Sequence, residues 1–345
     1  MRKIRLGRTG IEATAQSFGA LPIQRTETEE AVRILRAAVD GGINYFDTAR
    51  AYTDSEEKIG KAFSPSVRQG IYIATKSGGK NKEAVLNDIR KSLSLLKTDY
   101  VDLLQAHNIT AVPDENDENS IYAGLKEAQR LGYCRFIGVT SHRLDVAKAA
   151  IETGLYDTMQ FPISYLSAKE DLELIDMCKK ADMGMVAMKG LAGGAISSAK
   201  AAAAFMNLPP TLLPIWGIQH MWELEEFLEY GKNPPEMTEE LQAAIAKDKV
   251  ELSGNFCRAC GYCMPCTAAP EMEMNTTMRM YFNLRRMPPE QFLSEHWQKQ
   301  MLMIEKCINC GACKRRCPYG LDCPAVLKRN LADYREFCKA HGIII

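Results

Sequence analysis

The sequence has no net charge and no long hydrophobic segment. Its 345 residues include 43 basic and 43 acidic side chains, so the overall balance does not favour nucleic acid or an anionic membrane as a partner. No stretch approaches the roughly 18 apolar residues that a membrane-spanning helix needs, and no charged start followed by an apolar run marks a signal peptide. We therefore expect a cytoplasmic protein.

Cysteine is nearly absent from the first 250 residues, which contain only Cys134 and Cys178. The other ten cysteines fall between Cys257 and Cys338. Thiol buffers keep the cytosol reduced, so metal binding explains this clustering better than disulfide bonds do. We expect a cysteine-poor domain at residues 1–235, a linker and connecting helix at 236–256, and a metal domain at 257–345.

Short apolar runs alternate with stretches of helical periodicity across the cysteine-poor domain, which is typical of repeated βα units around a parallel sheet. The helical pattern is clear in residues 29–40 and 83–96. Eight strands in this length predict an α/β fold, a (β/α)8 barrel of the TIM type. We expect these strands at residues 16–19, 44–47, 71–76, 100–105, 135–140, 158–161, 185–188 and 212–215.

An open, doubly wound sheet is the alternative fold. Its first strand would have to run into a glycine-rich phosphate turn, but residues 16–19 run into Ala20-Leu21-Pro22 instead. Residues 3–6 and 11–13 flank Gly7-Arg8-Thr9-Gly10 and predict a hairpin that covers the floor of a barrel. The barrel is therefore the favoured prediction.

The C-terminal cysteines form two runs. The second run is a complete Cys-x2-Cys-x2-Cys-x3-Cys-Pro pattern, in which three thiolates bind one [4Fe–4S] cluster and the fourth binds its neighbour. The first run has only two residues before its fourth cysteine. We assign one cluster to Cys257, Cys260, Cys263 and Cys317, and the other to Cys307, Cys310, Cys313 and Cys266.

Cys266 is the least regular of these ligands, and Cys323 is close enough in sequence to replace it. Two structural zinc sites are the alternative, but zinc usually takes two Cys-x2-Cys pairs separated by a longer loop. A helical pattern in residues 289–304 predicts a mainly helical, ferredoxin-like domain. We expect Cys134 and Cys178 to be buried core residues, and we assign no function to Cys338.

Four polar residues fall at the carboxyl ends of three consecutive expected strands, where barrel enzymes place their catalytic groups. They are Asp47, Tyr52, Lys76 and His107. Tyr52 could donate a proton to an alkoxide if Lys76 made its phenol more acidic than usual, while Asp47 would hold Lys76 and His107 would orient a carbonyl. Singly, each could be a turn residue, a solvated lysine, a loop aromatic or a core histidine. Their joint occurrence favours catalysis.

Over about residues 1–235 the chain resembles the aldo-keto reductases, on the motifs NYFDTARAY followed by EEKIGKAF, YIATKS and DYVDLLQAH. The resemblance implies an oxidoreductase with Tyr52, Lys76, Asp47 and His107 as catalytic residues. It also implies NAD(P)H as cofactor, with contacts from Ser141, His142, Gln160, Met188, Gly193 and Gly194. Met188 stands where many relatives have a tyrosine, and a core role is the alternative for it. Where NADPH-using relatives place Lys and Arg on the 2′-phosphate, residues 215–222 contain neither, which leaves the choice of nicotinamide open.

The two halves differ in their electron chemistry, because a nicotinamide passes a hydride and a cluster passes single electrons. A flavin is the usual mediator, although no flavin-specific motif is visible. Residues 257–345 contain 13 Lys and Arg against 8 Asp and Glu, with Lys314-Arg315-Arg316 inside the second cysteine run. This predicts a docking face for an acidic carrier such as ferredoxin or flavodoxin; a solvated loop is the alternative.

The leading hypothesis is an oxidoreductase that reduces, or reversibly oxidises, a carbonyl or alcohol in the barrel while two [4Fe–4S] clusters carry electrons to or from the site. An NAD(P)H-dependent carbonyl reductase with structural clusters is the second hypothesis. A redox sensor or electron carrier without catalysis is the third.

Overall fold

The computed structural model describes residues 1–252, 256–286, 289–317 and 319–345. Residues 253–255, which belong to the expected linker, and Pro318, which ends the second cysteine run, lie outside the described residues. The described chain packs as two compact units, one made of Met1–Gly190 with Lys200–Leu241 and the other of Leu191–Ala199 with Gln242–Ile345. The domain limits expected from sequence stay a prediction.

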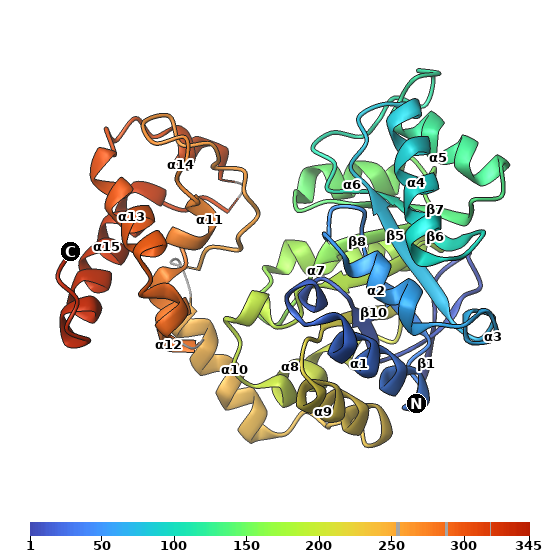
Figure 1. The fold of residues 1–345 in the computed structure, drawn as a ribbon, viewed down its shortest axis with the longest axis horizontal. Coiled ribbons are helices and arrows are strands. Elements are labelled where there is room, and N and C mark those ends of the chain that lie inside the picture. The colour runs from blue at the N-terminus through green and yellow to red at the C-terminus, as the bar shows by residue number, and fades with distance from the viewer. Residues whose placement is uncertain (253–255, 287–288, 318) are drawn as a thin grey trace. The chain divides into compact units, whose positions relative to one another are not determined.

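The first unit contains a closed barrel of eight parallel strands, in the order β10-β3-β4-β5-β6-β7-β8-β9 (Figure 1). This confirms the predicted (β/α)8 fold, and each strand lies close to its expected limits. The strands are β3 (Ser17–Gly19), β4 (Tyr45–Asp47), β5 (Tyr72–Ser77), β6 (Val101–Ala106), β7 (Cys134–Thr140), β8 (Thr158–Pro162), β9 (Gly184–Met188) and β10 (Leu212–Gly217).

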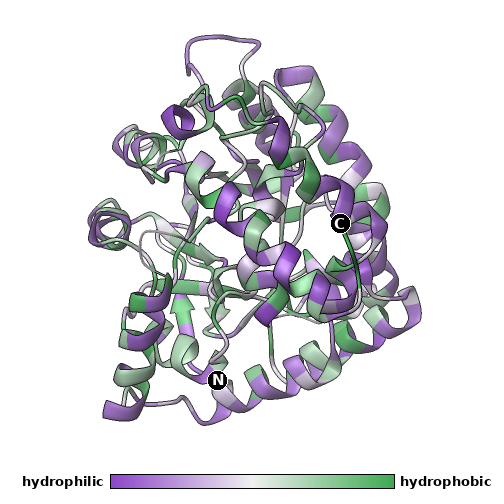
Figure 2. Cartoon of the chain, turned by 90° about the vertical axis from the view of Figure 1, so that its left-hand side faces the viewer, coloured by the Kyte–Doolittle hydropathy of each residue, from purple (hydrophilic) through white to green (hydrophobic). Residues whose placement is uncertain are grey.

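Amphipathic helices connect the strands. In α1 (Thr28–Asp40) the residues Ala31, Ile34, Leu35 and Ala38 are fully buried, at the spacing of one helical face. Hydrophobic and hydrophilic residues share the same helices in Figure 2. The other barrel helices are α2 (Ser55–Ala62), α3 (Pro65–Arg68), α4 (Lys82–Leu96), α5 (Ile121–Arg130), α6 (Leu144–Glu152), α7 (Lys169–Lys180), α8 (Ala199–Met206) and α9 (Met221–Lys232), with the 3-10 turn η1 (Pro22–Arg25). The 3-10 turn η2 (Ala192–Gly194) follows β9 in the chain and belongs to the second unit.

The predicted N-terminal hairpin is present as β1 (Lys3–Arg5) and β2 (Glu12–Thr14), paired antiparallel. Its apolar residues are buried in one cluster with Tyr45 of β4 and Leu213 of β10. The Thr14 amide donates to Asn44 Oδ1 just before β4, at 2.7 Å. The hairpin therefore closes the amino-terminal end of the barrel and leaves the carboxyl ends of the strands for the site.

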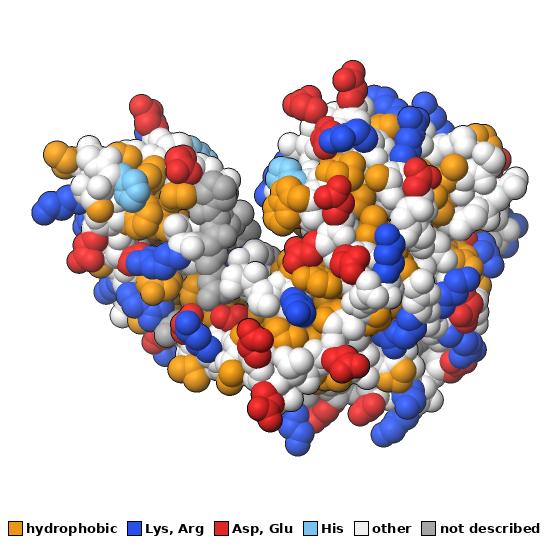
Figure 3. Space-filling view, turned by 90° about the horizontal axis from the view of Figure 1, so that it is seen from below, with side chains coloured by type: hydrophobic (Ala, Val, Ile, Leu, Met, Phe, Trp, Pro, Cys, Tyr) orange, Lys and Arg blue, Asp and Glu red, His pale blue; other side chains and the backbone are white. Residues whose placement is uncertain are grey.

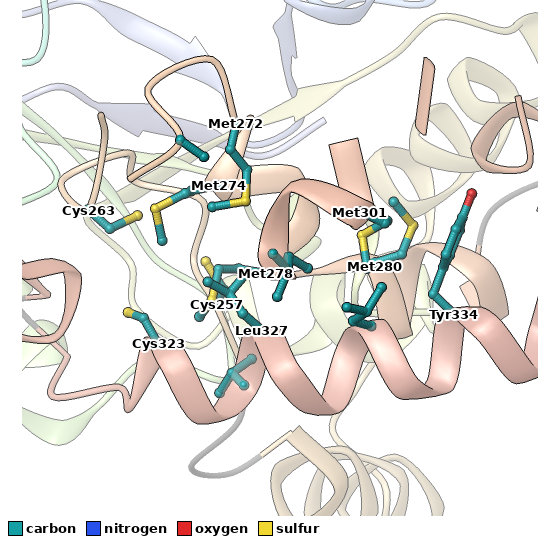
Figure 4. Packing of buried hydrophobic residues seen from close by; sticks show 14 of the residues in the cluster. Cys257, Cys263, Met272, Met274, Met278, Met280, Met301, Cys323, Leu327 and Tyr334 are labelled. Carbon is teal, nitrogen blue, oxygen red and sulfur yellow. The ribbon is translucent and has the colours of Figure 1, made fainter. Parts of the chain in front are cut away.

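The second unit is helical, as expected, and has a methionine-rich core. Met272, Met274, Met278, Met280 and Met301 are at most 1% exposed, and Figure 4 shows them along one side of the long α15. The residues 289–304 form a short helix between two 3-10 turns rather than one helix. The elements are α10 (Glu239–Leu252), α11 (Met274–Thr277), α12 (Met280–Arg286), η3 (Pro289–Phe292), α13 (Glu295–Leu302), η4 (Met303–Lys306), α14 (Ala312–Arg316) and α15 (Cys323–Ala340).

Acidic and basic side chains are interspersed over the surface seen in Figure 3. Among the described residues, no helix combines the length and the hydrophobicity required to cross a bilayer. Cys134 and Cys178 are buried, and burial raises the pKa of each to about 12, which fits the core role expected for them.

Candidate active site and cluster sites

The four candidate catalytic residues lie together at the carboxyl ends of β4, β5 and β6. Asp47 is the last residue of β4 and pairs in register with Ala74 of β5. Lys76 stands near the end of β5, and His107 directly follows β6. Tyr52 lies in the loop before α2. Because parallel strands end at the same rim of a barrel, side chains far apart in sequence meet there.

Lys76 and Asp47 form a buried ion pair. Lys76 Nζ lies 2.5 Å from Asp47 Oδ1 and 2.7 Å from the Thr48 carbonyl oxygen, and both side chains are at most 3% exposed. Burial alone would lower the pKa of Lys76, but the charges and hydrogen bonds of Asp47 and Tyr52 together outweigh it, so this pKa is raised. Lys76 therefore keeps its positive charge at neutral pH.

The Tyr52 ring lies beside both Lys76 and His107. Lys76 Nζ is 5.1 Å from the centroid of the Tyr52 ring, and the Tyr52 and His107 rings meet edge to face with centroids 5.8 Å apart. Burial raises the pKa of Tyr52 above its ordinary value, and Lys76 offsets only part of this. Lys76 therefore acts on the phenol in the expected direction, against the larger opposing effect of burial. The phenol stays protonated and available as a donor.

His107 is a neutral imidazole. Burial, followed by the positive charges of Lys76 and Lys80, lowers its pKa to about 4. A neutral imidazole carries one N–H donor and one acceptor nitrogen. His107 can therefore donate a hydrogen bond to an oxygen atom near Tyr52 without competing with Lys76 for a negative charge.

A second layer of polar residues holds these groups, and sequence reasoning missed it. Glu56 is 1% exposed, accepts a hydrogen bond from Thr75 Oγ1 at 2.6 Å and forms an ion pair with Arg50. Gln105 Nε2 donates to Asp47 Oδ2 at 3.4 Å. Glu56 therefore holds Thr75, the residue that precedes Lys76 in β5, in place. Its only sequence signal is its place in the EEKIGKAF motif.

Several predicted cofactor contacts lie on the neighbouring strands β7, β8 and β9. Thr140 pairs with Gln160, so Ser141 follows β7 close to the end of β8. The Gln160 Oε1 atom is buried and has no hydrogen-bond partner among the described residues. An unpaired buried carbonyl oxygen is costly, and the amide of a nicotinamide is a donor that would satisfy it. This position fits the cofactor.

The remaining predicted contacts differ in their surroundings. Ser141 Oγ is already engaged, since it donates to the Ile109 carbonyl at 3.0 Å. Burial, and then Lys189, lowers the pKa of His142 to about 3. Met188 ends β9, is half-buried and packs against the barrel core. Gly193 and Gly194 are exposed, have positive φ angles, and belong to the second unit rather than the first.

The stretch after β10 lacks a cationic phosphate site. Trp216 is buried and stacks on Phe227 with ring centroids 4.5 Å apart. At the start of α9, the backbone amides of Gln219 and His220 donate to Glu223 Oε2 at 2.8 and 3.0 Å. A carboxylate therefore occupies the amides that an anion would use at this helix N-terminus.

Two cavities in the second unit are lined by the cysteines. Cys266, Cys307, Cys310 and Cys313 line one of them. Cys257, Cys260, Cys263 and Cys317 line the other, together with Cys323. The two quartets are those assigned from the sequence pattern. Cys323 lies at the cavity of Cys317, and its side chain also hydrogen-bonds to Cys313 of the other quartet.

The cysteine geometry fits clusters better than single metal ions. Within the described part of the chain, no three His, Cys, Asp or Glu side chains approach closely enough to share one metal ion. Each quartet instead surrounds a cavity, and four thiolates spaced around a cavity are the donor set of a [4Fe–4S] cluster. Cys257 and Cys263 are buried, whereas Cys310 is exposed. One cavity is thus nearer to solvent than the other.

The basic tract beside the second cysteine run is exposed but structurally engaged. Lys314 forms an ion pair with Asp322 at 2.8 Å, and Arg315 donates to the Cys310 carbonyl at 3.1 Å. Arg316 donates to the carbonyls of Met264 and Pro265 at 3.2 and 3.0 Å. Arg316 therefore ties the two cysteine runs together, a role that local sequence did not indicate.

Comparisons with known proteins agree with this architecture. Residues 14–241 match the model of the aldo/keto reductase family, and residues 256–322 match that of a 4Fe–4S dicluster domain. Two relatives are an uncharacterised oxidoreductase, YqkF, of Bacillus subtilis, 29% identical over 211 residues, and L-galactose dehydrogenase of Arabidopsis thaliana, 30% identical over 210 residues. The matches cover 57% and 56% of this chain and 67% and 66% of those proteins. The chain thus spans about two thirds of the length of these relatives.

The solved structure of aldo-keto reductase AKR11C1 from Bacillus halodurans in its holo form has a similar fold. It aligns with a TM-score of 0.63 and 21% identity, over 72% of this chain and 96% of that structure. This likeness supports the fold alone.

Proposed function

Because this chain belongs to the aldo/keto reductase family, we propose that its barrel reduces, or in reverse oxidises, a small carbonyl or alcohol substrate, with two [4Fe–4S] clusters carrying electrons to or from a partner. The observation that carries the catalytic half is the buried Lys76–Asp47 ion pair beside Tyr52 and His107. Four residues from three strand ends form one constellation suited to proton transfer at an oxygen atom.

A bound reduced nicotinamide supplies the hydride for such a reduction. Tyr52 donates its phenolic proton to the carbonyl oxygen as negative charge develops there. The positive charge of Lys76 stabilises the tyrosinate that remains, and Asp47 keeps Lys76 charged and in place. The neutral His107 donates its N–H to the same oxygen and orients the carbonyl. In the oxidative direction Tyr52 accepts the proton.

The surroundings favour NADH over NADPH. Gln160 offers a buried carbonyl oxygen to the carboxamide of the nicotinamide. Glu223 presents a negative charge at the start of α9, and no Lys or Arg lies in residues 215–222. A 2′-phosphate placed here would meet repulsion instead of a cation.

The two cysteine quartets described above would hold the clusters, which would pass single electrons when bound. Two such electrons and one proton would be needed to regenerate each reduced nicotinamide, and a flavin is the mediator we propose between the two. The cavity with the exposed Cys310 is the proposed point of exchange with a carrier. Arg316 lines this cavity and Arg315 donates to the Cys310 carbonyl, and these positive charges suit an acidic ferredoxin or flavodoxin.

One observation favours a second function, in which the clusters are structural. Cys257 and Cys263 belong to the hydrophobic core of the second unit, so the clusters would replace part of a small core. In that case the enzyme would reduce carbonyls with NADH and would not respond to a one-electron carrier.

The decisive experiment is anaerobic purification with iron and sulfide counting, EPR, and extraction of bound nicotinamide or flavin. The purified enzyme is then assayed against a panel of aldehydes and ketones with NADH alone, and with reduced ferredoxin. We expect about eight irons per chain if both clusters are [4Fe–4S], and turnover that ferredoxin increases. Turnover with NADH that ferredoxin leaves unchanged would support the structural role, and no turnover with any donor would contradict an enzymatic function.

A further inference from the structure

The loop that carries Tyr52 is tied to strand β5, which carries Lys76. This loop joins β4 to α2 through a series of turns. The Arg50 amide donates to the Lys76 carbonyl oxygen at 3.0 Å, and the Thr48 carbonyl oxygen accepts a hydrogen bond from Lys76 Nζ at 2.7 Å. The backbone on the N-terminal side of Tyr52 is therefore joined to the strand that presents the lysine.

Glu56, near the start of α2, bridges the same loop and strand with its side chain. Its Oε1 atom accepts a hydrogen bond from Thr75 Oγ1 of β5 at 2.6 Å, and its Oε2 atom forms an ion pair with Arg50 of the loop. The Glu56 side chain is 1% exposed and that of Arg50 is 21% exposed. Hydrogen bonds between charged groups are stronger than those between neutral groups. Glu56 thus fastens the loop to the residue that precedes Lys76.

Neutral contacts close the loop on itself. The hydroxyl groups of Thr48 and Ser55 are 2.9 Å apart, and Ser55 Oγ donates to the carbonyl oxygen of Ala20 at 2.9 Å. The Ser55 amide donates to the Tyr52 carbonyl oxygen at 2.8 Å. These bonds fix the ends of the loop, whereas the ion pair of Glu56 with Arg50 supplies the charged side-chain contact that leads to β5.

We infer that Glu56 is a positioning residue for Tyr52, because through Arg50 and Thr75 it holds the Tyr52 loop against β5 at the separation from Lys76 that proton transfer needs. This inference rests on the proposed function. Lys76 Nζ is 5.1 Å from the centroid of the Tyr52 ring, and a displacement of about 1 Å in a reacting group can lower a rate on the order of a hundredfold. Glu56 acts through the residues it holds and is not itself a proton donor.

The first test is Glu56→Gln, which keeps the size of the side chain and an acceptor for Thr75 but removes the charge that Arg50 pairs with. We expect kcat to fall by about tenfold to a hundredfold, with little change in KM for the carbonyl or in NADH affinity, because the lost alignment matters in the transition state. Glu57→Gln is the matched control. Glu57 is the next residue of α2 and its ion pair with Lys61 is exposed, so its kcat should be unchanged.

Hydrogen exchange of the full chain, measured by mass spectrometry, reports the loop without any need for turnover. In Glu56→Gln we expect faster exchange in residues 48–54, where the amides of Arg50 and Tyr52 are hydrogen-bonded, and unchanged exchange in α6. A substitution that only destabilised the barrel would increase exchange in both places. Arg50→Gln, at a more exposed side chain, should give the same local change and serves if Glu56→Gln folds poorly.

Thr75 provides a test by conservative replacement. Thr75→Ser keeps the hydroxyl donor to Glu56 and should keep kcat, whereas Thr75→Val should lower it. Unchanged kcat in Glu56→Gln and Arg50→Gln, or a loss of kcat without a local increase in exchange, would overturn the inference and leave the proposed catalysis standing. Absence of turnover in the unmodified protein would instead contradict the proposed function, and the exchange rates alone would then decide whether Glu56 holds the loop.

Discussion

Lys76 Nζ lies 2.5 Å from Asp47 Oδ1, and neither side chain is more than 3% exposed. Each buried charge is therefore stabilised by its partner, which compensates for the loss of water around it. Replacing Asp47 with Asn leaves an unpaired buried lysine, and breaking a buried pair from one side typically costs about 3–5 kcal/mol.

We predict that Asp47→Asn loses this amount of stability in urea unfolding and nearly all turnover, because the charge beside Tyr52 is then neutralised or displaced. Asp182→Asn is the matched control, since its ion pair with Arg5 is more than half exposed on both sides, and its stability should be unchanged within error. Equal losses in both variants would contradict a special role for the buried pair.

Tyr52→Phe removes the proposed proton donor while keeping the ring that packs edge to face on His107. We predict a fall in kcat of about two to four orders of magnitude, with little change in the affinity for NADH measured by fluorescence. Tyr230→Phe provides the control, because the Tyr230 hydroxyl donates to Glu226 one turn earlier in the same helix, α9. Retention of full activity in Tyr52→Phe towards every substrate tried would exclude the proposed mechanism and revive a sensor function.

His107 and His142 make the stability of the first unit depend on pH. Burial lowers their pKa values from 6.5 to about 4 and about 3, so the unfolded chain binds more protons than the folded chain below pH 6.5. The contribution of these two histidines to the free energy of unfolding is therefore fully present above pH 6.5 and is lost as the pH falls towards 4. His107→Gln and His142→Gln should each reduce this decline. Urea midpoints at pH 7 and pH 5 measure this loss of stability. Comparing each variant with the unmodified protein at the same pH cancels acid effects common to all of them, cluster loss included. An unchanged difference between the two pH values in both variants would contradict the assignment of the pH dependence to these histidines.

Glu223→Ala frees the backbone amides of Gln219 and His220 and removes a negative charge at the start of α9. We predict that the ratio of kcat/KM for NADPH to that for NADH rises by about tenfold, the equivalent of 1.4 kcal/mol. Glu229→Ala is the control, since its bond to Asn233 lies at the other end of the same helix. An unchanged ratio would show that Glu223 does not face the adenosine ribose.

The barrel was predictable because each strand and helix carries its own periodic signal, and the rim residues follow from where strands end. Contacts between distant segments carry no such signal. Glu56 supports Lys76 through Thr75, Arg316 links the two cysteine runs, and Arg279 holds a turn that is 86 residues away in sequence. Local sequence shows only a charged residue at each position. The surroundings of Tyr52 show the same limit: Lys76, which lowers the pKa of Tyr52, could be expected from the sequence, but the burial that raises this pKa could not.

The positions of Cys266 and Cys323 give a direct test of the cluster assignment. Cys266 lines the cavity of Cys307, Cys310 and Cys313, whereas Cys323 lines the other cavity and is 1% exposed. We predict that Cys266→Ser loses one cluster, halving the iron content or converting one EPR signal to that of a three-iron form. Cys323→Ser should keep both clusters, because a neutral hydroxyl still fits the small buried space beside Cys317.

Cys338→Ser, on α15, is a control for the loss of a buried thiol from the same unit. Iron and sulfide counts on anaerobically purified samples distinguish the outcomes. Full iron content in Cys266→Ser combined with loss in Cys323→Ser would reverse the assignment of the eighth ligand. Cys323 lines the cavity of Cys317 but also hydrogen-bonds to Cys313, so that result would mean that its thiolate turns towards the cavity of Cys307 on cluster binding.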